Sequence, residues 1–328
     1  MQRIADPTSP NSWHYRELNK KNPGLDHLSN GLIRLVELGY PIIAGSADLQ
    51  YSNGLNRFAE RYPNRYVGFG ISEQNMVSAA AGLATTGMMP FVATFASFIG
   101  LLTCEQIRMD VAYCAQPVRL IGHHTGISMG FYGTSHHATE DIGTMRSIAD
   151  LTVVSTADGP QLEAAIIASV EHDRPIYFRT GRGREPSLYP LDFKFSYGKA
   201  ITHLVGEELT VIACGLPVHP SVQVARRLSN AGRSIGVIDM PTIKPLDRDS
   251  IIEAATRSKY ILTIEEHNIY GGLGSAVAEV LAEEGSNCRL IRHGIKDEFA
   301  LIAPPLQLYA HYKLDEEGIE SVIRDIVQ

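Results

Sequence analysis

Short apolar runs rich in β-branched residues alternate with helical stretches along most of the chain. Six runs in the first half are typical of strands: 41–48, 65–70, 90–95, 118–124, 151–156 and 175–180. The stretches between them are typical of helices, and one begins at Asp158-Gly159-Pro160, with proline in the first turn. This alternation predicts parallel sheets covered by helices on both faces, so the fold class is α/β.

A polar stretch that contains glycine and proline interrupts the alternation at residues 181–199 and is the best candidate for a linker. Strand and helix patterns then resume as far as the C-terminus. The 328 residues suffice for two domains, because a domain commonly contains about 100–200 residues. We therefore predict two parallel-sheet domains, at 25–190 and 191–328, after an N-terminal extension at 1–24.

Charge and cysteine content exclude several classes of protein. The net charge of −7 argues against a nucleic-acid backbone as the main partner. The four cysteines form no CxxC pair, which argues against a zinc ribbon or a disulfide scaffold and suits a reducing compartment. The first residues contain no apolar segment typical of a signal peptide, so we expect a cytoplasmic protein.

One long segment, 74–104, contains no charged residue. A membrane span is a poor interpretation, because Gly82, Gly87 and Pro90 interrupt the segment and leucine is not dominant in it. We expect instead a buried helix, a turn and a strand, with part of the segment packed against another chain. No contact with a membrane is expected.

Motifs that bind phosphate or activate a serine give little guidance. GxGxxG after a strand and GxxxxGK[ST] do not occur, and we expect no nucleophilic serine of the hydrolase type. The segment 271–275, GGLGS, opens a predicted helix and could hold an anion there, although a tight turn is the favoured interpretation.

Two histidine pairs flank a glycine-rich loop: His123-His124 ends a predicted strand, and His136-His137 follows the loop. Their spacing matches no common zinc pattern, and we predict no metal site there. Loops at the carboxyl ends of strands carry the ligand sites of α/β sheets. These histidines are therefore expected to bind substrate or to transfer protons.

Glu73 directly follows a predicted strand and begins the uncharged helix. It could simply complement the helix dipole, or it could serve as a proton-relay group at the border of an apolar region. Phe95 and Phe98, taken alone, are typical of a core. Together with Glu73 they indicate a site for a flat heteroaromatic ligand, with rings to enclose it and a carboxyl to bind its nitrogen.

Five segments in this order, GSADLQYSN, GISEQNM, PFVATFASFIG, HHTGISMGFYGTSHHATED and PIYFRTGRG, resemble the pyrimidine-binding domain of the transketolase family. The segments CGLPVHPSVQVARRL, IDMPTIKPLD and EEHNIYGGLGSAVAE resemble its C-terminal domain. Ordinary transketolases have a further N-terminal half, whose GDG…N motif binds Mg²⁺ and the diphosphate of thiamine diphosphate. No GDG occurs here. The resemblance therefore implies the C-terminal subunit of a split, thiamine diphosphate-dependent transketolase.

The resemblance also implies residue roles. Glu73 matches the glutamate that binds N1′ of the cofactor's aminopyrimidine and promotes loss of the thiazolium C2 proton. Phe95 and Phe98 match aromatic residues around the pyrimidine, Leu101 replaces a third, and Asp48 matches a residue of the cofactor pocket.

His136 matches a histidine that contacts the donor hydroxyls at the bond that breaks, and His124 matches a substrate-binding histidine. Ser52 and Arg179 match groups that hold the substrate phosphate. Two departures, Tyr132 for an aspartate and Asp26 for a second arginine, point to a specialised phosphorylated or acidic sugar.

The implied reaction moves a two-carbon ketol unit from a ketose to an aldose. The implied partner is an N-terminal transketolase subunit that holds most of the cofactor and the Mg²⁺. The resemblance also implies that copies of this chain associate with one another, as in a heterotetramer. Two alternatives stay open at this point: the β subunit of a 2-oxo acid dehydrogenase E1 component, which shares this pair of domains, and an inactive regulatory paralogue.

Overall fold

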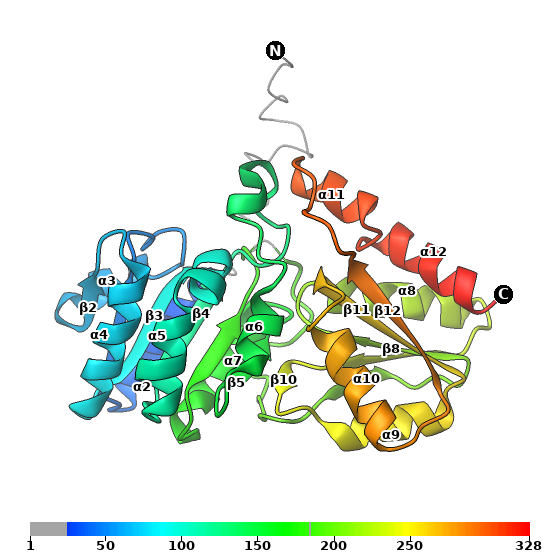
Figure 1. Ribbon diagram of the computed structural model, residues 1–328, viewed down its shortest axis with the longest axis horizontal. Helices are drawn as coiled ribbons and strands as arrows, with labels where there is room; N and C mark the ends of the chain where they lie inside the picture. Colours follow the sequence, from blue (N-terminus) through cyan, green and yellow to red (C-terminus); the bar gives the residue numbers. More distant parts are fainter. Residues whose placement is uncertain (1–24, 184) are drawn as a thin grey trace, which may run out of the picture.

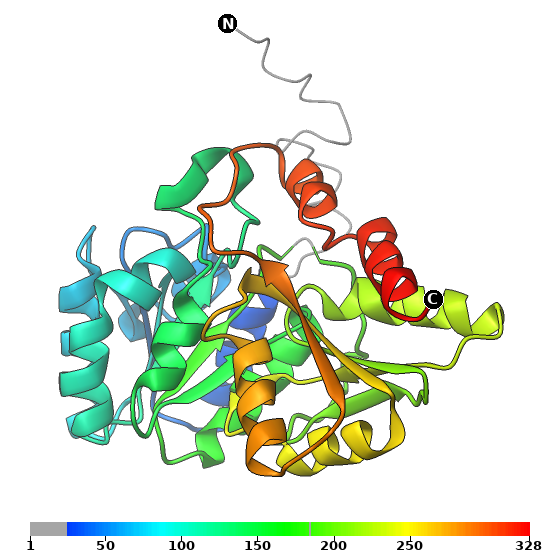
Figure 2. The same ribbon diagram turned by 45° about the vertical axis from the view of Figure 1, so that its right-hand side comes forward.

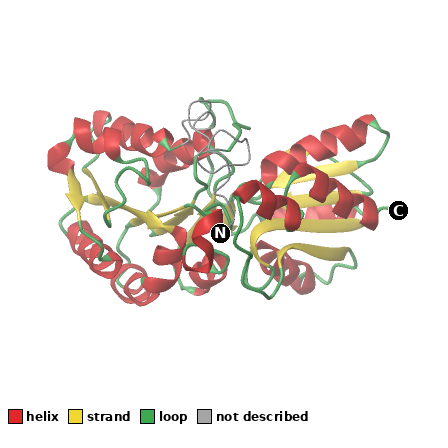
Figure 3. Ribbon diagram, turned by 90° about the horizontal axis from the view of Figure 1, so that it is seen from above, coloured by secondary structure: helices red, strands yellow, loops and turns green. Residues whose placement is uncertain are grey.

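The computed structural model of the chain describes residues 25–183 and 185–328. The predicted N-terminal extension at 1–24 lies outside this part. Two sheets stand beside each other, and helices cover both faces of each, as the view from above shows (Figures 1 and 3). The predicted α/β class is confirmed.

The first sheet has seven strands in the order β10-β5-β6-β4-β3-β1-β2. Six of them are parallel, and β10 pairs antiparallel with β5. The strands are β1 (Ile42–Ser46), β2 (Tyr66–Gly68), β3 (Met89–Phe95), β4 (Arg119–His123), β5 (Thr152–Ser155), β6 (Ile176–Arg179) and β10 (Thr242–Lys244). Because β10 belongs to the second half of the chain, that half completes the first sheet, and the boundary at residue 190 stays a prediction.

The second sheet has five strands in the order β12-β11-β8-β9-β7, with β7 antiparallel to β9. Its strands are β7 (Ile201–Leu204), β8 (Leu209–Ala213), β9 (Ile235–Asp239), β11 (Tyr260–Asn268) and β12 (Arg289–Ile295). Its helices are α8 (Val218–Asn230), α9 (Arg248–Arg257), α10 (Leu273–Glu283), α11 (Pro305–His311) and α12 (Glu316–Ile326).

Helices α2 and α7 pack together on one face of the first sheet. Helix α4 packs against the π-helical turns η2 and η3. The helices are α2 (Asp26–Glu37), α3 (Asn56–Arg61), α4 (Glu73–Thr85), α5 (Cys104–Gln106), α6 (Asp141–Ser147) and α7 (Gly159–Ala168). The shorter turns are η1 (Pro63–Arg65), η2 (Phe98–Leu102), η3 (Ile107–Tyr113), η4 (Gly130–Ser135) and η5 (Ser169–Glu171).

The uncharged segment 74–104 forms the predicted helix, turn and strand, as α4 and β3. Much of it is buried, but Leu101 and Leu102 on η2 are half exposed. Within the described part of the chain, no helix combines the length and the apolar character needed to cross a bilayer.

Buried polar contacts fasten the linker to both sheets. The Asp158 carboxylate accepts hydrogen bonds from the backbone of Tyr189 and from Gln161 at the start of α7. The Tyr189 hydroxyl donates to Asp239 at the end of β9 over 2.6 Å, and the Gln161 amide donates to the same oxygen over 2.7 Å. Burial raises the pKa of Asp239 to about 7, although both hydrogen bonds oppose this rise.

A raised pKa in the folded state makes stability depend on pH. The folded protein keeps its proton on Asp239 between about pH 4 and pH 7, where the unfolded chain has lost it, so Asp239 lowers the free energy of unfolding as pH rises through this window. We expect the free energy of unfolding of Asp239→Asn to rise by about 2–4 kcal/mol relative to that of the wild type between pH 4 and pH 7, since one pKa unit corresponds to about 1.4 kcal/mol. Urea unfolding across pH measures this difference, with the exposed Asp249→Asn as control. A constant difference across the window would contradict the expectation.

Candidate active site

The carboxyl ends of four adjacent parallel strands bring most of the predicted residues to one edge of the first sheet. Ser46 on β1 pairs with Gly68 on β2 and with Ala93 on β3, and Phe95 on β3 pairs with His123 on β4. The residues that follow these strand ends are Asp48, Glu73, Phe98 and His124. Parallel pairing places them together, as expected for a ligand site of this fold class.

Glu73 is the first residue of α4 and is 5 % exposed. Gly70 precedes it with φ of +67°, a conformation that favours glycine and turns the chain sharply from β2 into the helix. The Thr94 hydroxyl on β3 lies 3.4 Å from Oε1 of Glu73. A carboxylate offers about four acceptor positions, so beyond this one contact the Glu73 carboxylate still has capacity to bind a ligand nitrogen.

Aromatic and imidazole rings form a cluster at the end of β3, the strand that carries Thr94. The Phe95 ring centroid lies 5.6 Å from that of Phe98, 4.7 Å from that of His124 and 5.8 Å from that of His136. His136 also contacts Phe98 at 5.3 Å and Tyr132 at 4.9 Å. The four predicted residues of this group thus form one connected cluster around Phe95, and Tyr132 covers His136 from the side of the loop.

The two histidines of the first pair have different surroundings. His123 is fully buried, and burial lowers its pKa to about 4, so its ring is neutral at physiological pH. His124 has φ of +61°, and its ring packs against the ring of Phe95. Partial burial also lowers the pKa of His136, so this ring favours the neutral form that can accept a proton. In the described residues, no group of three His, Cys, Asp or Glu side chains is placed to hold a metal ion.

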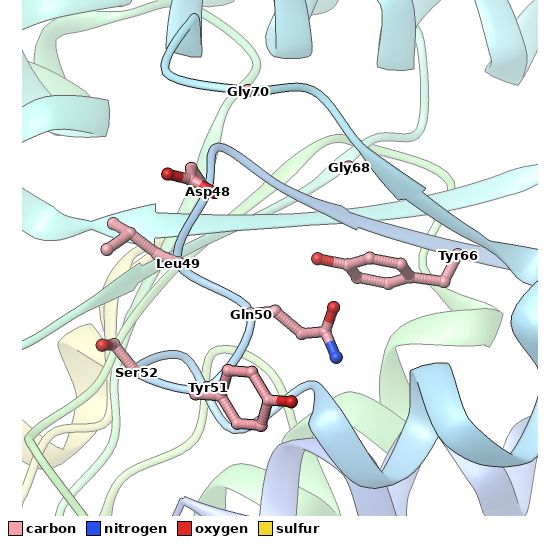
Figure 4. A pocket seen from close by; sticks show the side chains of 8 residues that line it. All are labelled: Asp48, Leu49, Gln50, Tyr51, Ser52, Tyr66, Gly68 and Gly70. Atoms are coloured by element: carbon pink, nitrogen blue, oxygen red, sulfur yellow. The ribbon is translucent and has the colours of Figure 1, made fainter.

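Asp48 and Ser52 line a pocket of about 440 Å³ beside the ends of β1 and β2. Its wall is formed by Asp48, Leu49, Gln50, Tyr51, Ser52, Tyr66, Gly68 and Gly70. Figure 4 shows Asp48 and Ser52 pointing to one side of the backbone, whereas Gln50 points toward Tyr66 on the other. Asp26 begins α2 and lies 3.5 Å from Arg57, which offsets its charge.

Arg179 lies inside the protein. It is 1 % exposed, and its Nε is 3.1 and 2.9 Å from the two carboxylate oxygens of Asp141. Its Nη2 donates to the backbone oxygens of Ala138 and Glu266, at 3.1 and 2.8 Å. Burial alone would lower the pKa of Arg179, but Asp141 and Glu266 raise it, so the guanidinium stays charged. The phosphate role of Arg179 stays a prediction that this geometry does not favour.

We expect Arg179→Ala to lower the free energy of unfolding by about 3–5 kcal/mol, because Asp141 would keep a buried charge without its partner. Chemical unfolding measures this loss. Any remaining activity should fall equally for a phosphorylated ketose donor and for its dephosphorylated counterpart. An increase in KM confined to the phosphorylated donor, in a variant of unchanged stability, would instead support the phosphate role.

The backbone of the glycine-rich segment 271–275 binds a carboxyl side chain of the protein itself, that of Glu265. The carboxylate of Glu265 accepts from the backbone nitrogens of Leu273 and Gly274 at the start of α10, at 2.7 and 2.8 Å. A Cβ atom on Gly272 would lie 1.9 Å from the Glu265 carboxylate, so this approach requires glycine. The helix start is thus a close turn around an internal carboxylate.

Comparison with known proteins agrees with this arrangement. The family model "Transketolase, pyrimidine binding domain" matches residues 26–186, and the model "Transketolase, C-terminal domain" matches residues 198–319. This chain belongs to the transketolase family. Its two matched regions correspond to the two sheets, except that β10 crosses from the second region to the first sheet.

Several relatives that match this transketolase chain over most of their length are separate subunits. It is 37% identical to a subunit of the apulose-4-phosphate transketolase of Phocaeicola vulgatus, over 90% of this chain and 95% of the relative. It is 34% identical to "6-deoxy-6-sulfo-D-fructose transketolase subunit SqwH" of a Clostridium species, over 88% of this chain and 89% of the relative. A solved structure described as "Split gene transketolase, inactive beta4 tetramer" superposes with a TM-score of 0.85 at 32% identity, covering 93% of this chain and 98% of the other. These similarities favour a transketolase subunit over both alternatives.

Sequence reasoning missed three side chains that support the histidine loop, namely the buried Asp141 and Glu266 and the partly buried Tyr309. The segment EEHNIYGGLGSAVAE carried the family resemblance, and its pair of adjacent glutamates in an apolar strand was the available signal.

Proposed function

We propose that this chain is the C-terminal subunit of a thiamine diphosphate-dependent transketolase, and that it binds the aminopyrimidine half of the cofactor. The observation that carries the proposal is the meeting of Glu73, Phe95, Phe98, His124 and His136 at one edge of the sheet, in a chain that matches separate transketolase subunits over nearly their whole length.

The residues present fit a flat ring that carries a basic nitrogen. Phe95 and Phe98 would enclose the ring, and the buried Glu73 carboxylate would bind the nitrogen and hold the proton that moves there. Asp48 would contact the cofactor from the end of β1. When bound, thiamine diphosphate supplies a stabilised carbanion equivalent for breaking and forming carbon–carbon bonds. We propose that Mg²⁺ and the diphosphate are held by the N-terminal subunit with the GDG…N motif.

His136 and His124 would act on the sugar. Both rings contact Phe95, so both belong to the same cluster. A neutral His136 can accept the proton of a donor hydroxyl as the carbon–carbon bond breaks, and His124 can orient the sugar by hydrogen bonding. Tyr132 packs against His136 and narrows the approach for the acceptor.

We propose an anionic sugar as substrate. The names of two relatives specify a sugar phosphate and a sulfonated sugar. Ser52 lines the pocket beside β1 and β2, and His124 follows the end of β4, where both can bind an anion. We propose that Arg182, three residues after Arg179, supplies the cation that meets this anion.

A donor series tests the substrate class. We expect the assembled enzyme to use a phosphorylated or sulfonated ketose with kcat/KM at least about tenfold above the uncharged ketose of equal length, because loss of a charge-assisted contact costs about 1.5–3 kcal/mol. Coupled assays of the released aldose measure the transfer. Arg182→Ala should remove most of this preference while leaving the uncharged donor nearly unaffected. Equal use of charged and uncharged donors by the wild type would contradict an anionic substrate.

We further propose that the assembly contains copies of both subunits in the cytoplasm, as a heterotetramer that serves carbohydrate metabolism. A similar protein forms a tetramer of this kind of subunit alone, described as inactive. Half-exposed apolar side chains at the edge of the site, including Leu101 and Leu102, provide a surface for such contacts.

A further inference from the structure

We infer that Glu266, on the second sheet, is a positioning residue: its carboxylate holds the loop that carries His124 and His136. The inference rests on the proposed function, because those two histidines are proposed to act on the sugar. Figure 2 shows the segment before α11 rising beside the loop that contains η4, so the second domain contacts this loop.

One carboxylate oxygen joins three parts of the fold. Glu266 lies on β11 and is 1 % exposed. Its Oε1 accepts a hydrogen bond from the backbone nitrogen of Ile127 over 2.8 Å and from the hydroxyl of Tyr309 on α11 over 2.7 Å. Ile127 comes three residues after His124, so this oxygen restrains the loop close to where it leaves β4.

The two ends of the loop are joined to each other. Gly126 and Ala138 form two backbone hydrogen bonds, of 3.1 and 2.8 Å, and each lies two residues after one of the site histidines. A Cβ on Gly126 would lie 2.1 Å from Cδ of Glu266, so the carboxylate presses against a backbone that only glycine allows. A shift of Glu266 would therefore move His124 and His136 together.

Arg179 reinforces the same junction from the first sheet. One of its nitrogens bonds both the Ala138 oxygen and the Glu266 backbone oxygen, while Asp141 holds its Nε. Because these groups are buried in a medium of low dielectric, a missing partner is costly, and the arrangement of the loop is sharply defined.

The charge on Glu266 affects how strongly its carboxylate restrains the loop after β4. The groups that face it are Arg179 on β6 with its partner Asp141, Tyr309 on α11 and Glu185 in the linker. Burial raises the pKa of Glu266 to about 7, whereas Arg179 and the bonds from Tyr309 and Ile127 lower it. The ionised carboxylate is the stronger acceptor, so the restraint weakens as pH falls through about 7.

Tyr309→Phe tests the inference in the assembled enzyme, with Tyr197→Phe as a matched control. The Tyr197 hydroxyl donates to the Ala165 oxygen on α7. We expect Tyr309→Phe to lower kcat roughly tenfold with little change in KM, since small displacements of catalytic groups are costly. The acid limb of its kcat profile should move to higher pH, because a contact that lowers the pKa of Glu266 is lost. Glu266→Gln should keep more activity than Glu266→Ala and should lose this limb.

A second readout does not depend on activity. In the full-length chain labelled with ¹³C-histidine, we expect Tyr309→Phe to shift the NMR signals of His124 and His136, and Tyr197→Phe to leave them in place. Shifted signals in a chain whose assembled wild-type enzyme transfers no ketol unit would uphold the positioning role and refute the proposed function. Unchanged signals and an unchanged pH profile in Tyr309→Phe would overturn the inference.

Discussion

Glu73→Gln is expected to lower the turnover of the assembled enzyme by about 10²–10⁴-fold, the usual cost of losing a group that transfers a proton. Glutamine has nearly the same shape as glutamate but cannot take up or release the proton. The carboxylate is held by the Thr94 hydroxyl at 3.4 Å, and a single long hydrogen bond of this kind contributes little to stability. We therefore expect the free energy of unfolding of the Glu73→Gln variant to differ from that of the wild type by about 1 kcal/mol or less.

Two measurements separate the role of Glu73 from a loss of folding. Deuterium exchange at C2 of added thiamine diphosphate reports on proton removal before any sugar binds, and urea unfolding reports on stability. The control is Glu105→Gln, at the far end of the uncharged segment, where the side chain is exposed. Unchanged exchange in folded Glu73→Gln enzyme would remove Glu73 from the catalytic role.

Local pattern predicted much of the fold because local forces determine it. Strand β4 and helix α7 appear where β-branched runs and a proline-containing helix start occur in the sequence. The positions of Glu73, Phe95 and His124 at strand ends were equally visible, because parallel strands end at the same edge. Their contacts, such as that between Phe95 and His136, needed the structure, since the loop after β4 must fold back over β3.

Long-range pairing explains what the sequence did not reveal. Strand β10 pairs with β5 across about ninety residues, and a run of three residues has too little pattern to show its partner. The position of Arg179 depends on Asp141 and on Glu266, which lie 38 and 87 residues away. A charged residue at the carboxyl end of a parallel strand is a candidate ligand group, and the buried Asp141 beside Arg179 changes this interpretation.

The purified chain alone is expected to catalyse no ketol transfer, and activity should appear when an N-terminal transketolase subunit is added. The groups proposed for this chain, Glu73 with Phe95 and Phe98, would meet only one ring of the cofactor. A single aromatic enclosure of this kind contributes only a few kcal/mol of binding, which is weak in the absence of a site for the charged diphosphate. Transfer also requires that water be kept from the reacting carbon, and a shared interface would do this.

Mixing experiments test this dependence. The chain is titrated with the second subunit at fixed thiamine diphosphate and Mg²⁺, and ketol transfer and cofactor binding are followed together. Both should rise in proportion to the complex formed. Glu73→Gln chain, mixed in the same way, is the control: it should form the complex and bind the cofactor, yet transfer little, so that activity cannot come from the added subunit. Full activity of the wild-type chain alone would show that it holds the whole cofactor site, and the division of the cofactor between two chains would then be wrong.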